Sequence, residues 1–440
     1  MKNVLVMGAG MVSPPLVDYL LDKGYFVYLG DLDGSRAERV LQGRNHSKGI
    51  ALDIGNLQQV RDVARDVDLV ISLLPPKFHL DLAQICLDLG KHFLTASYLS
   101  PVMEALHDQA HAKGLIFMNE IGVDPGLDHV TAMNMIDTAK DDGYQIIGFD
   151  SHCGGIPSKD AANNPLRYKF SWSPAGVLRA ITRTSRFQSR GHVVQVPGRE
   201  KLHHAEVLHI PGLGIFESLP NADSLYYGER YGLEGAQTIR RGTLRYPGWS
   251  QFWLFMLSLD FLDERKSMSF EDEQVLCALF KVAGWTPPED IFTFVHEKAD
   301  THASVFLEAM ESLGLLDQDQ RISGTLSAFD IILHCAQQRL NYQQHETDLL
   351  VLHHELMVEK AGRKERWSST LSREGIPEGT TAMAFLVGVP AAIAARMILE
   401  NQIQERGILL PISRSVYKPI LDELIAMGLP HETHRTPLTD

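Results

Sequence analysis

Two glycines and one acid near the start of the chain have the types and spacing to bind a dinucleotide. Gly8 and Gly10 follow the apolar run of residues 4–7, and Asp31 lies 21 residues after Gly10. Gly8 permits a tight turn, and Gly10 lets the backbone approach a pyrophosphate without a side chain in the way. A carboxylate about 20 residues further on can accept hydrogen bonds from ribose hydroxyls.

The same turn continues through Met11 and Val12, which we assign to the cofactor site as well. The carboxylate of Asp31 would accept a bond from a ribose 2′-OH and repel a 2′-phosphate, so it favours NAD, with NADP as the other possibility. Ser13 stands where a third glycine often occurs. A short Gly-x-Gly also occurs in α/β turns that bind nothing, and this is the competing interpretation.

The elements around this turn predict a Rossmann-type, doubly wound parallel sheet. Short apolar strands are expected at residues 4–7, 25–29, 68–74, 91–96 and 115–119, with amphipathic helices between them. Ligands of such sheets bind beyond the carboxyl ends of the strands. The loops at residues 74–75, 96–98 and 122–126 therefore belong to the predicted cofactor side.

After residue 126 the pattern changes to glycine- and proline-separated strands and then to helices. We predict a dinucleotide-binding domain at 1–126, a mixed α/β domain at 127–250 and 346–380, a helical insertion at 251–345, and a C-terminal segment at 381–440 that returns to the first domain. Within the insertion, residues 252–262 and 273–283 read as amphipathic helices. The last ten residues are polar and are expected to be loosely held.

Charge and cysteine content narrow the possible partners and compartments. The net charge of −14 argues against nucleic acid or an anionic membrane surface as a partner. The apolar stretch at 382–399 contains Pro390 and Arg396 and fits a packed helix better than a membrane span. The first strand begins at once, so no secretory leader is expected. Four scattered cysteines, without metal-ligand spacing, favour a reduced cytoplasmic protein and predict no metal site.

Four segments carry a more specific signal. Residues 152–177 read HCGGIPSKDAANNPLRYKFSWSPAGV, and further motifs lie at 95–101, 122–129 and 241–246. Together they closely resemble the L-glutamate-forming saccharopine dehydrogenases, also called saccharopine reductases. The resemblance extends over nearly the whole chain.

The resemblance implies a fold, an activity and a set of contacts. The fold would be a dinucleotide domain, a mixed α/β domain that also forms a homodimer contact, and a helical insertion. The activity would be reversible oxidation of saccharopine, a small tricarboxylate amino acid, to L-glutamate and 2-aminoadipate 6-semialdehyde in lysine metabolism. The implied substrate contacts are Ser97, Tyr98, Asp124, Thr243, Leu244 and Arg245, and the implied neighbours of the nicotinamide are Leu74, Ala96, Val123 and Pro125.

The chemistry of that substrate adds candidates from the matched segments. Three carboxylates call for arginine, whose planar fork pairs with them in a bidentate manner. Arg245 is the first candidate, followed by Arg167 and Arg241, and Lys169 would act as a point charge. For acid–base work the weak candidates are Asp124, Lys169 and His129, with Tyr168 also within reach. Asp124 is favoured for binding the ammonium of an amino-acid end, and a catalytic base is left unassigned.

Two departures from the family pattern keep alternatives open. Ala222 stands where family members often carry an arginine that contacts a substrate carboxylate, and fungal members lack an acid at the place of Asp31. The first alternative is a related enzyme of the same fold, such as a carboxynorspermidine dehydrogenase, that acts on another secondary amine. The second is a non-catalytic NAD-binding protein.

Overall fold

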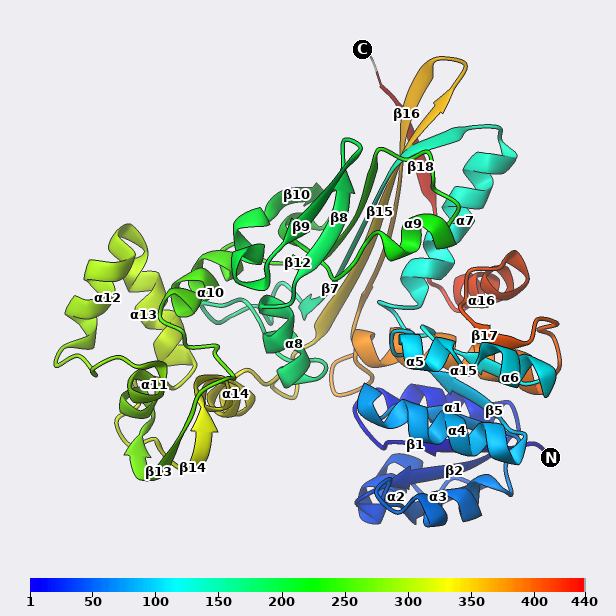
Figure 1. The fold of residues 1–440 in the computed structure, drawn as a ribbon, viewed down its shortest axis with the longest axis horizontal. Helices are drawn as coiled ribbons and strands as arrows, with labels where there is room; N and C mark the ends of the chain where they lie inside the picture. The colour runs from blue at the N-terminus through cyan, green and yellow to red at the C-terminus, as the bar shows by residue number, and fades with distance from the viewer. Residues whose placement is uncertain (439–440) are drawn as a thin grey trace. The chain divides into compact units, whose positions relative to one another are not determined.

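The computed structural model describes residues 1–438, and these divide into two compact units (Figure 1). The first unit consists of Met1–Ser151, Glu229–Gly235 and His354–Asp440, and the second of His152–Gly228 and Ala236–His353. Each unit has its own apolar core.

A seven-stranded sheet forms the base of the first unit. Its strand order is β17-β6-β5-β4-β1-β2-β3, and every neighbouring pair is parallel. The strands are β1 (Asn3–Met7), β2 (Phe26–Asp31), β3 (Ser47–Ala51), β4 (Leu69–Ser72), β5 (His92–Thr95), β6 (Ile116–Met118) and β17 (Gly407–Leu409). This confirms the predicted Rossmann-type fold, and it adds β3, a half-exposed edge strand that lacks a buried apolar run.

Helices connect these strands and cover the sheet (Figure 1). A loop follows the carboxyl end of each strand and leads into the next helix. The helices of this unit are α1 (Ser13–Asp22), α2 (Gly34–Leu41), α3 (Leu57–Ala64), α4 (His79–Leu89), α5 (Pro101–Glu104), α6 (His107–Ala112), α7 (Leu127–Asp141), α15 (Ala382–Leu399) and α16 (Arg414–Ala426), with a 3-10 turn at Pro76–Phe78.

Helix α15 is long and apolar enough, by length and composition alone, to cross a membrane. It packs against α1, and 83% of its 18 residues are buried inside the fold. Gly388 lies so close to α1 that an added Cβ would come within 2.9 Å of the carbonyl oxygen of Val12. These contacts are those of a core helix.

A second, nine-stranded sheet contains the order β10-β11-β12-β7-β15-β16-β18, with β8 paired to β12 and β9 paired to β8. Its strands are β7 (Gln145–Pro157), β8 (Ser185–Ser189), β9 (His192–Val196), β10 (Glu206–Ile210), β11 (Gly214–Pro220), β12 (Thr238–Arg245), β15 (Asp348–Lys360), β16 (Arg363–Glu374) and β18 (Thr433–Pro437). Strands β7 and β15 each contribute residues to both units.

Helices dominate the rest of the second unit. They are α8 (Pro174–Ile181), α10 (Trp249–Ser258), α11 (Val275–Ala283), α12 (Ile291–Ala299), α13 (Ala303–Ser312) and α14 (Ala328–Arg339), with 3-10 turns at Gly198–His204 and Asp300–His302 and the short α9 (Tyr226–Arg230) before β12. The predicted helical insertion also contains an antiparallel pair, β13 (Ser267–Gln274) and β14 (Arg321–Ser327). This antiparallel pair was not predicted, because β13 is mostly exposed and lacks an apolar run.

The C-terminal segment contributes to both sheets. Strand β17 joins the parallel sheet, whereas β18 pairs antiparallel with β16 in the second sheet. The expectation that the last ten residues are loosely held was therefore wrong for residues 433–437, which are fixed by backbone pairing; residues 439–440 lie outside the described part. The predicted domain boundaries stay a prediction.

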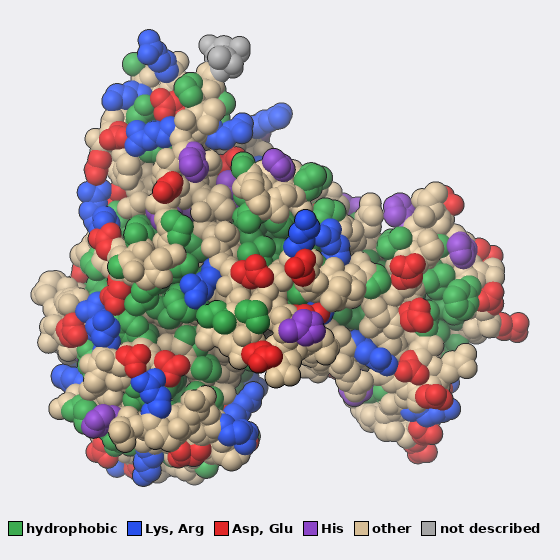
Figure 2. All heavy atoms as spheres, turned by 180° about the vertical axis from the view of Figure 1, so that it is seen from behind, with side chains coloured by type: hydrophobic (Ala, Val, Ile, Leu, Met, Phe, Trp, Pro, Cys, Tyr) green, Lys and Arg blue, Asp and Glu red, His purple; other side chains and the backbone are tan. Residues whose placement is uncertain are grey.

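The surface mixes charges of both signs. On the face drawn in Figure 2, acidic and basic side chains are interspersed, and no single basic patch stands out.

Candidate active site

The turn after β1 has the shape of a phosphate cradle. Gly8 has φ +108, and an added Cβ would meet Leu74 Cδ2 at 3.3 Å, so the position requires glycine. An added Cβ at Gly10 would meet nothing within 4 Å, which leaves open space against the backbone. Helix α1 begins directly afterwards, and Val12 at its N-cap supplies no side-chain hydrogen bond. The predicted turn thus fits a pyrophosphate at a helix N-terminus.

Asp31 closes the same edge of the sheet from the end of β2. Its Oδ2 accepts the backbone N–H of Ala9 at 2.8 Å, and its Oδ1 accepts that of Asp33 at 3.1 Å. These bonds fix a carboxylate beside the glycine turn. Arg39 of α2 is engaged elsewhere, since it donates to Ser35 Oγ at 2.9 Å and pairs with Asp33 at 3.5 Å.

Ser97 follows β5, and a buried histidine holds its hydroxyl. His79 Nε2 is hydrogen-bonded to Ser97 Oγ at 2.8 Å, and His79 Nδ1 to Ser72 Oγ at 3.0 Å. Burial lowers the pKa of His79 to about 4, so its imidazole is neutral at physiological pH. The predicted substrate contact Ser97 therefore has a fixed orientation.

Tyr98 and Asp124, two of the predicted substrate contacts, are joined by a hydrogen bond. Tyr98 Oη donates to Asp124 Oδ1 at 2.8 Å, which joins the loops after β5 and β6. The backbone of the second loop turns back closely on itself. An added Cβ at Gly126, which has φ +145, would lie only 2.1 Å from Gly122 N, so this position requires glycine. At the start of this loop, an added Cβ at Gly122 would lie 3.0 Å from the Cβ of Ala96.

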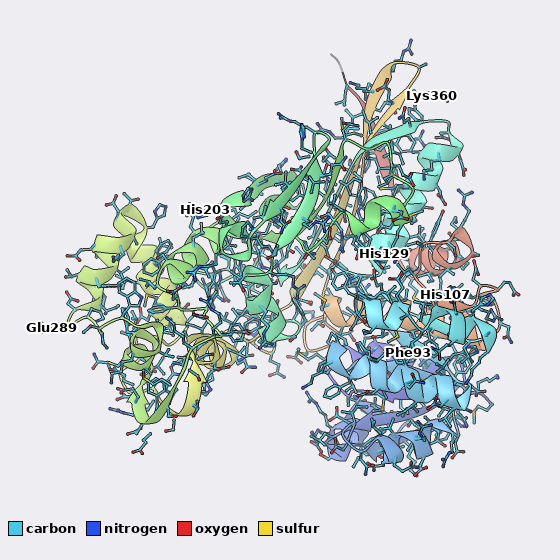
Figure 3. The ribbon with its side chains drawn as sticks, in the orientation of Figure 1. Phe93, His107, His129, His203, Glu289 and Lys360 are labelled. Atoms are coloured by element: carbon cyan, nitrogen blue, oxygen red, sulfur yellow. The ribbon has the colours of Figure 1, made fainter. Side chains whose placement is uncertain are left out.

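His129, a weak candidate for acid–base work, is buried and bonded to two protein side chains. It lies on α7 and is 0% exposed (Figure 3). Its Nε2 is hydrogen-bonded to Glu120 Oε2 at 2.8 Å and its Nδ1 to Tyr231 Oη at 2.5 Å. This placement favours a role in holding the loop that contains Glu120, and it argues against proton exchange with a ligand.

The second unit carries a buried cation. Arg245, at the end of β12, is 4% exposed, and its guanidinium lies 4.8 Å from the ring centre of Tyr168 and 5.2 Å from that of Trp249. Its Nη1 donates to Leu244 O at 2.7 Å, and its Nε is buried without a hydrogen-bond partner among residues 1–438. Within those residues it forms no ion pair. A buried, uncompensated guanidinium is costly unless an anion joins it.

Other predicted cations are engaged by neighbouring side chains. Arg167 stacks over the ring of Tyr246 at 4.2 Å, and Arg241, 4% exposed, over that of Tyr227 at 4.4 Å. Lys169 is ion-paired with Glu346 at 2.5 Å, and both side chains are buried. This pairing neutralises the charge of Lys169. It argues against the predicted roles of Lys169 as a point charge for the ligand and as an acid–base residue.

The two other predicted contacts on β12, and the departure at Ala222, have the following surroundings. Leu244 is 0% exposed and faces the core, where an added Cβ at Gly154 would lie 2.7 Å from its Cβ, so only its backbone is left for a ligand. Thr243 is half-buried on the same strand. Ala222 has φ +44, and its carbonyl accepts the N–H of Arg186 at 2.8 Å.

Lys201, which the sequence reasoning missed, is also buried in the second unit. It is 2% exposed, and its Nζ donates to Ala180 O at 2.7 Å. Burial, with the charges of Arg183 and Arg245 nearby, lowers its pKa to about 7. His79 and Glu120 were missed as well. Glu120 interrupts the apolar run of residues 115–123, whereas Lys201 and His79 lie among polar residues and give no sequence signal of burial.

No group of three or more histidine, cysteine, aspartate or glutamate side chains that could hold a metal ion occurs among residues 1–438. The four cysteines are all free thiols.

The parallel sheet, glycine turn and terminal acid define a dinucleotide-binding protein of the α/β class. Residues 4–118 match the family described as the saccharopine dehydrogenase NADP binding domain, and residues 122–429 match the saccharopine dehydrogenase C-terminal domain. The chain belongs to the saccharopine dehydrogenase family, which confirms the resemblance.

Individual relatives agree with this assignment. The chain is 34% identical to saccharopine dehydrogenase [NADP(+), L-glutamate-forming] of Schizosaccharomyces pombe, over 98% of each chain. It is 35% identical to alpha-aminoadipic semialdehyde synthase of Arabidopsis thaliana over 97% of its own length, but it spans only 44% of that protein. The solved apo structure of saccharopine dehydrogenase (L-Glu forming) from Saccharomyces cerevisiae superimposes with a TM-score of 0.89 at 31% identity, covering 99% of this chain and all of that one.

Proposed function

We propose that this chain catalyses the reversible oxidation of saccharopine to L-glutamate and 2-aminoadipate 6-semialdehyde, a reaction of lysine metabolism. Family membership and the names of the full-length relatives support the reaction class. The observation that carries the substrate is Arg245, a buried guanidinium without an ion pair among residues 1–438. Such a group is stabilised when a carboxylate of the ligand supplies the missing anion.

Each unit carries its own candidate groups for binding a charged ligand. In the second unit, Arg245 receives one carboxylate, with the half-buried Thr243 and the backbone of Leu244 beside it on β12. In the first unit, Asp124 accepts the ammonium of an amino-acid end, and the bond from Tyr98 keeps its carboxylate in place. The fixed Ser97 hydroxyl adds a neutral contact.

We propose NAD as the preferred cofactor, although the matched domain family and the Schizosaccharomyces pombe relative carry NADP in their names. The turn at Gly8 and Gly10 accommodates a pyrophosphate, and Asp31 presents a carboxylate at the end of β2. When bound, the nicotinamide supplies the hydride acceptor. A negative charge at Asp31 suits two ribose hydroxyls and disfavours a 2′-phosphate. Leu74 beside Gly8, together with Ala96, Val123 and Pro125, would lie toward the nicotinamide.

Ala222 supports a second candidate function. The arginine that many family members carry at this position is absent, and a smaller secondary amine with one carboxylate fewer would not need it. The carboxynorspermidine dehydrogenase-like reaction is of this kind.

The test is an assay of the full chain with saccharopine and each oxidised cofactor, followed by product analysis. We expect an increase in absorbance of the reduced nicotinamide, faster with NAD, and one L-glutamate formed for each cofactor reduced. Turnover of a smaller carboxylated amine without turnover of saccharopine would favour the second candidate. Cofactor binding without turnover of any amine would favour a non-catalytic protein.

Assembly, partners and location stay proposals. A homodimer follows from the family resemblance, and light scattering after size-exclusion chromatography would test it. A cytoplasmic location and the absence of nucleic-acid and membrane partners rest on the acidic net charge and on the four free cysteines.

A further inference from the structure

Behind the loop that carries Tyr98 lies a chain of three buried polar side chains. Glu120, His129 and Tyr231 are 1%, 0% and 2% exposed. His129 bonds Glu120 through Nε2 at 2.8 Å and Tyr231 through Nδ1 at 2.5 Å. Burying a carboxylate and an imidazole costs free energy unless they are well paired, so the arrangement calls for a purpose beyond packing.

Glu120 also reaches the site loop directly. Its Oε1 accepts the N–H of Leu99 at 2.8 Å, one residue after Tyr98, and its own N–H donates to Ser97 O at 3.1 Å. One side chain and one amide therefore hold both ends of the segment 97–99. The neighbouring N–H of Ile121 donates to Thr95 O at 3.3 Å, which ties the same loop to the end of β5.

The backbone of Glu120 shows how firmly this arrangement is held. Its φ is +56, in the left-handed region that residues other than glycine rarely adopt. A residue persists in that region when the surrounding contacts fix it, and such residues cluster at functional sites. Here the fixing contacts are the bonds to Leu99, Ser97 and His129.

We propose that Glu120, held by His129 and Tyr231, is a positioning residue that sets Tyr98 against Asp124 for ligand binding. Asp124 follows four residues after Glu120 in the same loop, and Tyr98 precedes Leu99, so the network controls both partners of the 2.8 Å bond between Tyr98 and Asp124. This inference rests on the proposed function only for the identity of the ligand, saccharopine. The hydrogen-bond network of Glu120, His129 and Tyr231 is independent of that function.

The test compares Glu120→Ala with a matched control, Glu423→Gln. Glu423 is a partly buried carboxylate of the same unit that accepts bonds from Tyr19 and Arg396 and touches no site loop. We expect Glu120→Ala to raise KM for saccharopine about tenfold or more, since small displacements of positioned groups have effects of that order. Both variants should lose thermal stability, but Glu423→Gln should keep the wild-type KM. A wild-type KM in folded Glu120→Ala would overturn the proposal.

A double-mutant cycle with Tyr98→Phe separates positioning from general destabilisation. If Glu120 acts through Tyr98, the double variant should have nearly the KM of Glu120→Ala alone, because the bond from Tyr98 is already misplaced. Effects that multiply would show that the two residues act independently and would overturn the proposal. Should Glu120→Ala fail to fold, Glu120→Gln keeps the length and replaces it in the cycle.

Hydrogen exchange distinguishes this inference from the proposed function. We expect the amide of Leu99 to exchange at least about tenfold faster in Glu120→Ala than in the wild type or Glu423→Gln, because it loses its acceptor. That result needs no substrate and would hold even if the wild type did not oxidise saccharopine. Unchanged exchange at Leu99 would overturn the inference while leaving the proposed function intact.

Discussion

The candidate residues of the two units differ in how completely their polar groups are paired. In the first unit, Ser97, Tyr98 and Asp124 have protein partners at 2.8 Å. In the second unit, Arg245 has a buried Nε without a hydrogen-bond partner among residues 1–438.

This difference points to two binding strategies. A fully paired network fixes the geometry before the ligand arrives and changes little on binding. A buried cation without an anion stores unfavourable desolvation that a carboxylate relieves. Changes in the second unit should therefore remove a binding charge directly, and those in the first unit should weaken binding by displacing the groups that contact the ligand.

The largest effect is expected from Arg245→Ala. Removing the buried guanidinium should raise KM for saccharopine by about a hundredfold or more, the loss typical of a buried charge-assisted pair. Arg199→Ala is the control, because this exposed arginine of the same unit bonds Leu257 O and Asp260 instead of any candidate site residue among residues 1–438. Steady-state kinetics measure both, and a near-normal KM for Arg245→Ala would remove this residue from the site.

Asp31→Ser should change the cofactor preference rather than the substrate affinity. Loss of the carboxylate should weaken NAD about tenfold, because a hydrogen bond to a charged group is lost, and should relatively favour NADP. The ratio of kcat/KM for the two cofactors measures this. An unchanged ratio would contradict the placement of Asp31 beside the ribose.

Tyr98→Phe should have a smaller effect. The bond to Asp124 is lost, and a single hydrogen bond corresponds to about a threefold to tenfold rise in KM for saccharopine. Thermal stability should stay close to that of the wild type, because the ring is 37% exposed. A KM equal to that of the wild type would show that Asp124 needs no help from Tyr98.

The smallest effect concerns stability at acid pH. Burial lowers the pKa of His79 and of His431 from 6.5 to about 4, so the unfolded chain binds more protons between these values. The free energy of unfolding should therefore be fully retained above pH 6.5 and fall as the pH drops toward 4, on the order of 2 kcal/mol for each histidine.

Two asparagine variants separate the site from the rest of the fold in this pH range. Both His79→Asn and His431→Asn should flatten the acid loss seen in urea unfolding. Only His79→Asn should also raise KM, because His79 bonds Ser97 whereas His431 bonds Ser369 at 3.0 Å. If the free energy of unfolding fell as steeply with decreasing pH in both variants as in the wild type, the pH dependence would not come from these two histidines.

The sequence predicts local features of this fold better than distant contacts. The glycine turn, Asp31 and the parallel strands follow from short apolar runs and their order, and the structure confirms the fold. Strands β3 and β13 were missed because their exposed residues give no apolar pattern. The bond between His129 and Tyr231 joins residues 102 positions apart, so no local pattern could reveal it.

The most direct test of the account is the rate of cofactor reduction with saccharopine and NAD, measured side by side for the wild type and Arg245→Ala. We predict turnover by the wild type and a severe loss of affinity, with a folded protein, in the variant. Absence of turnover by the wild type with either NAD or NADP would contradict the proposed function, and equal KM values in the two proteins would contradict the role given to the buried cation.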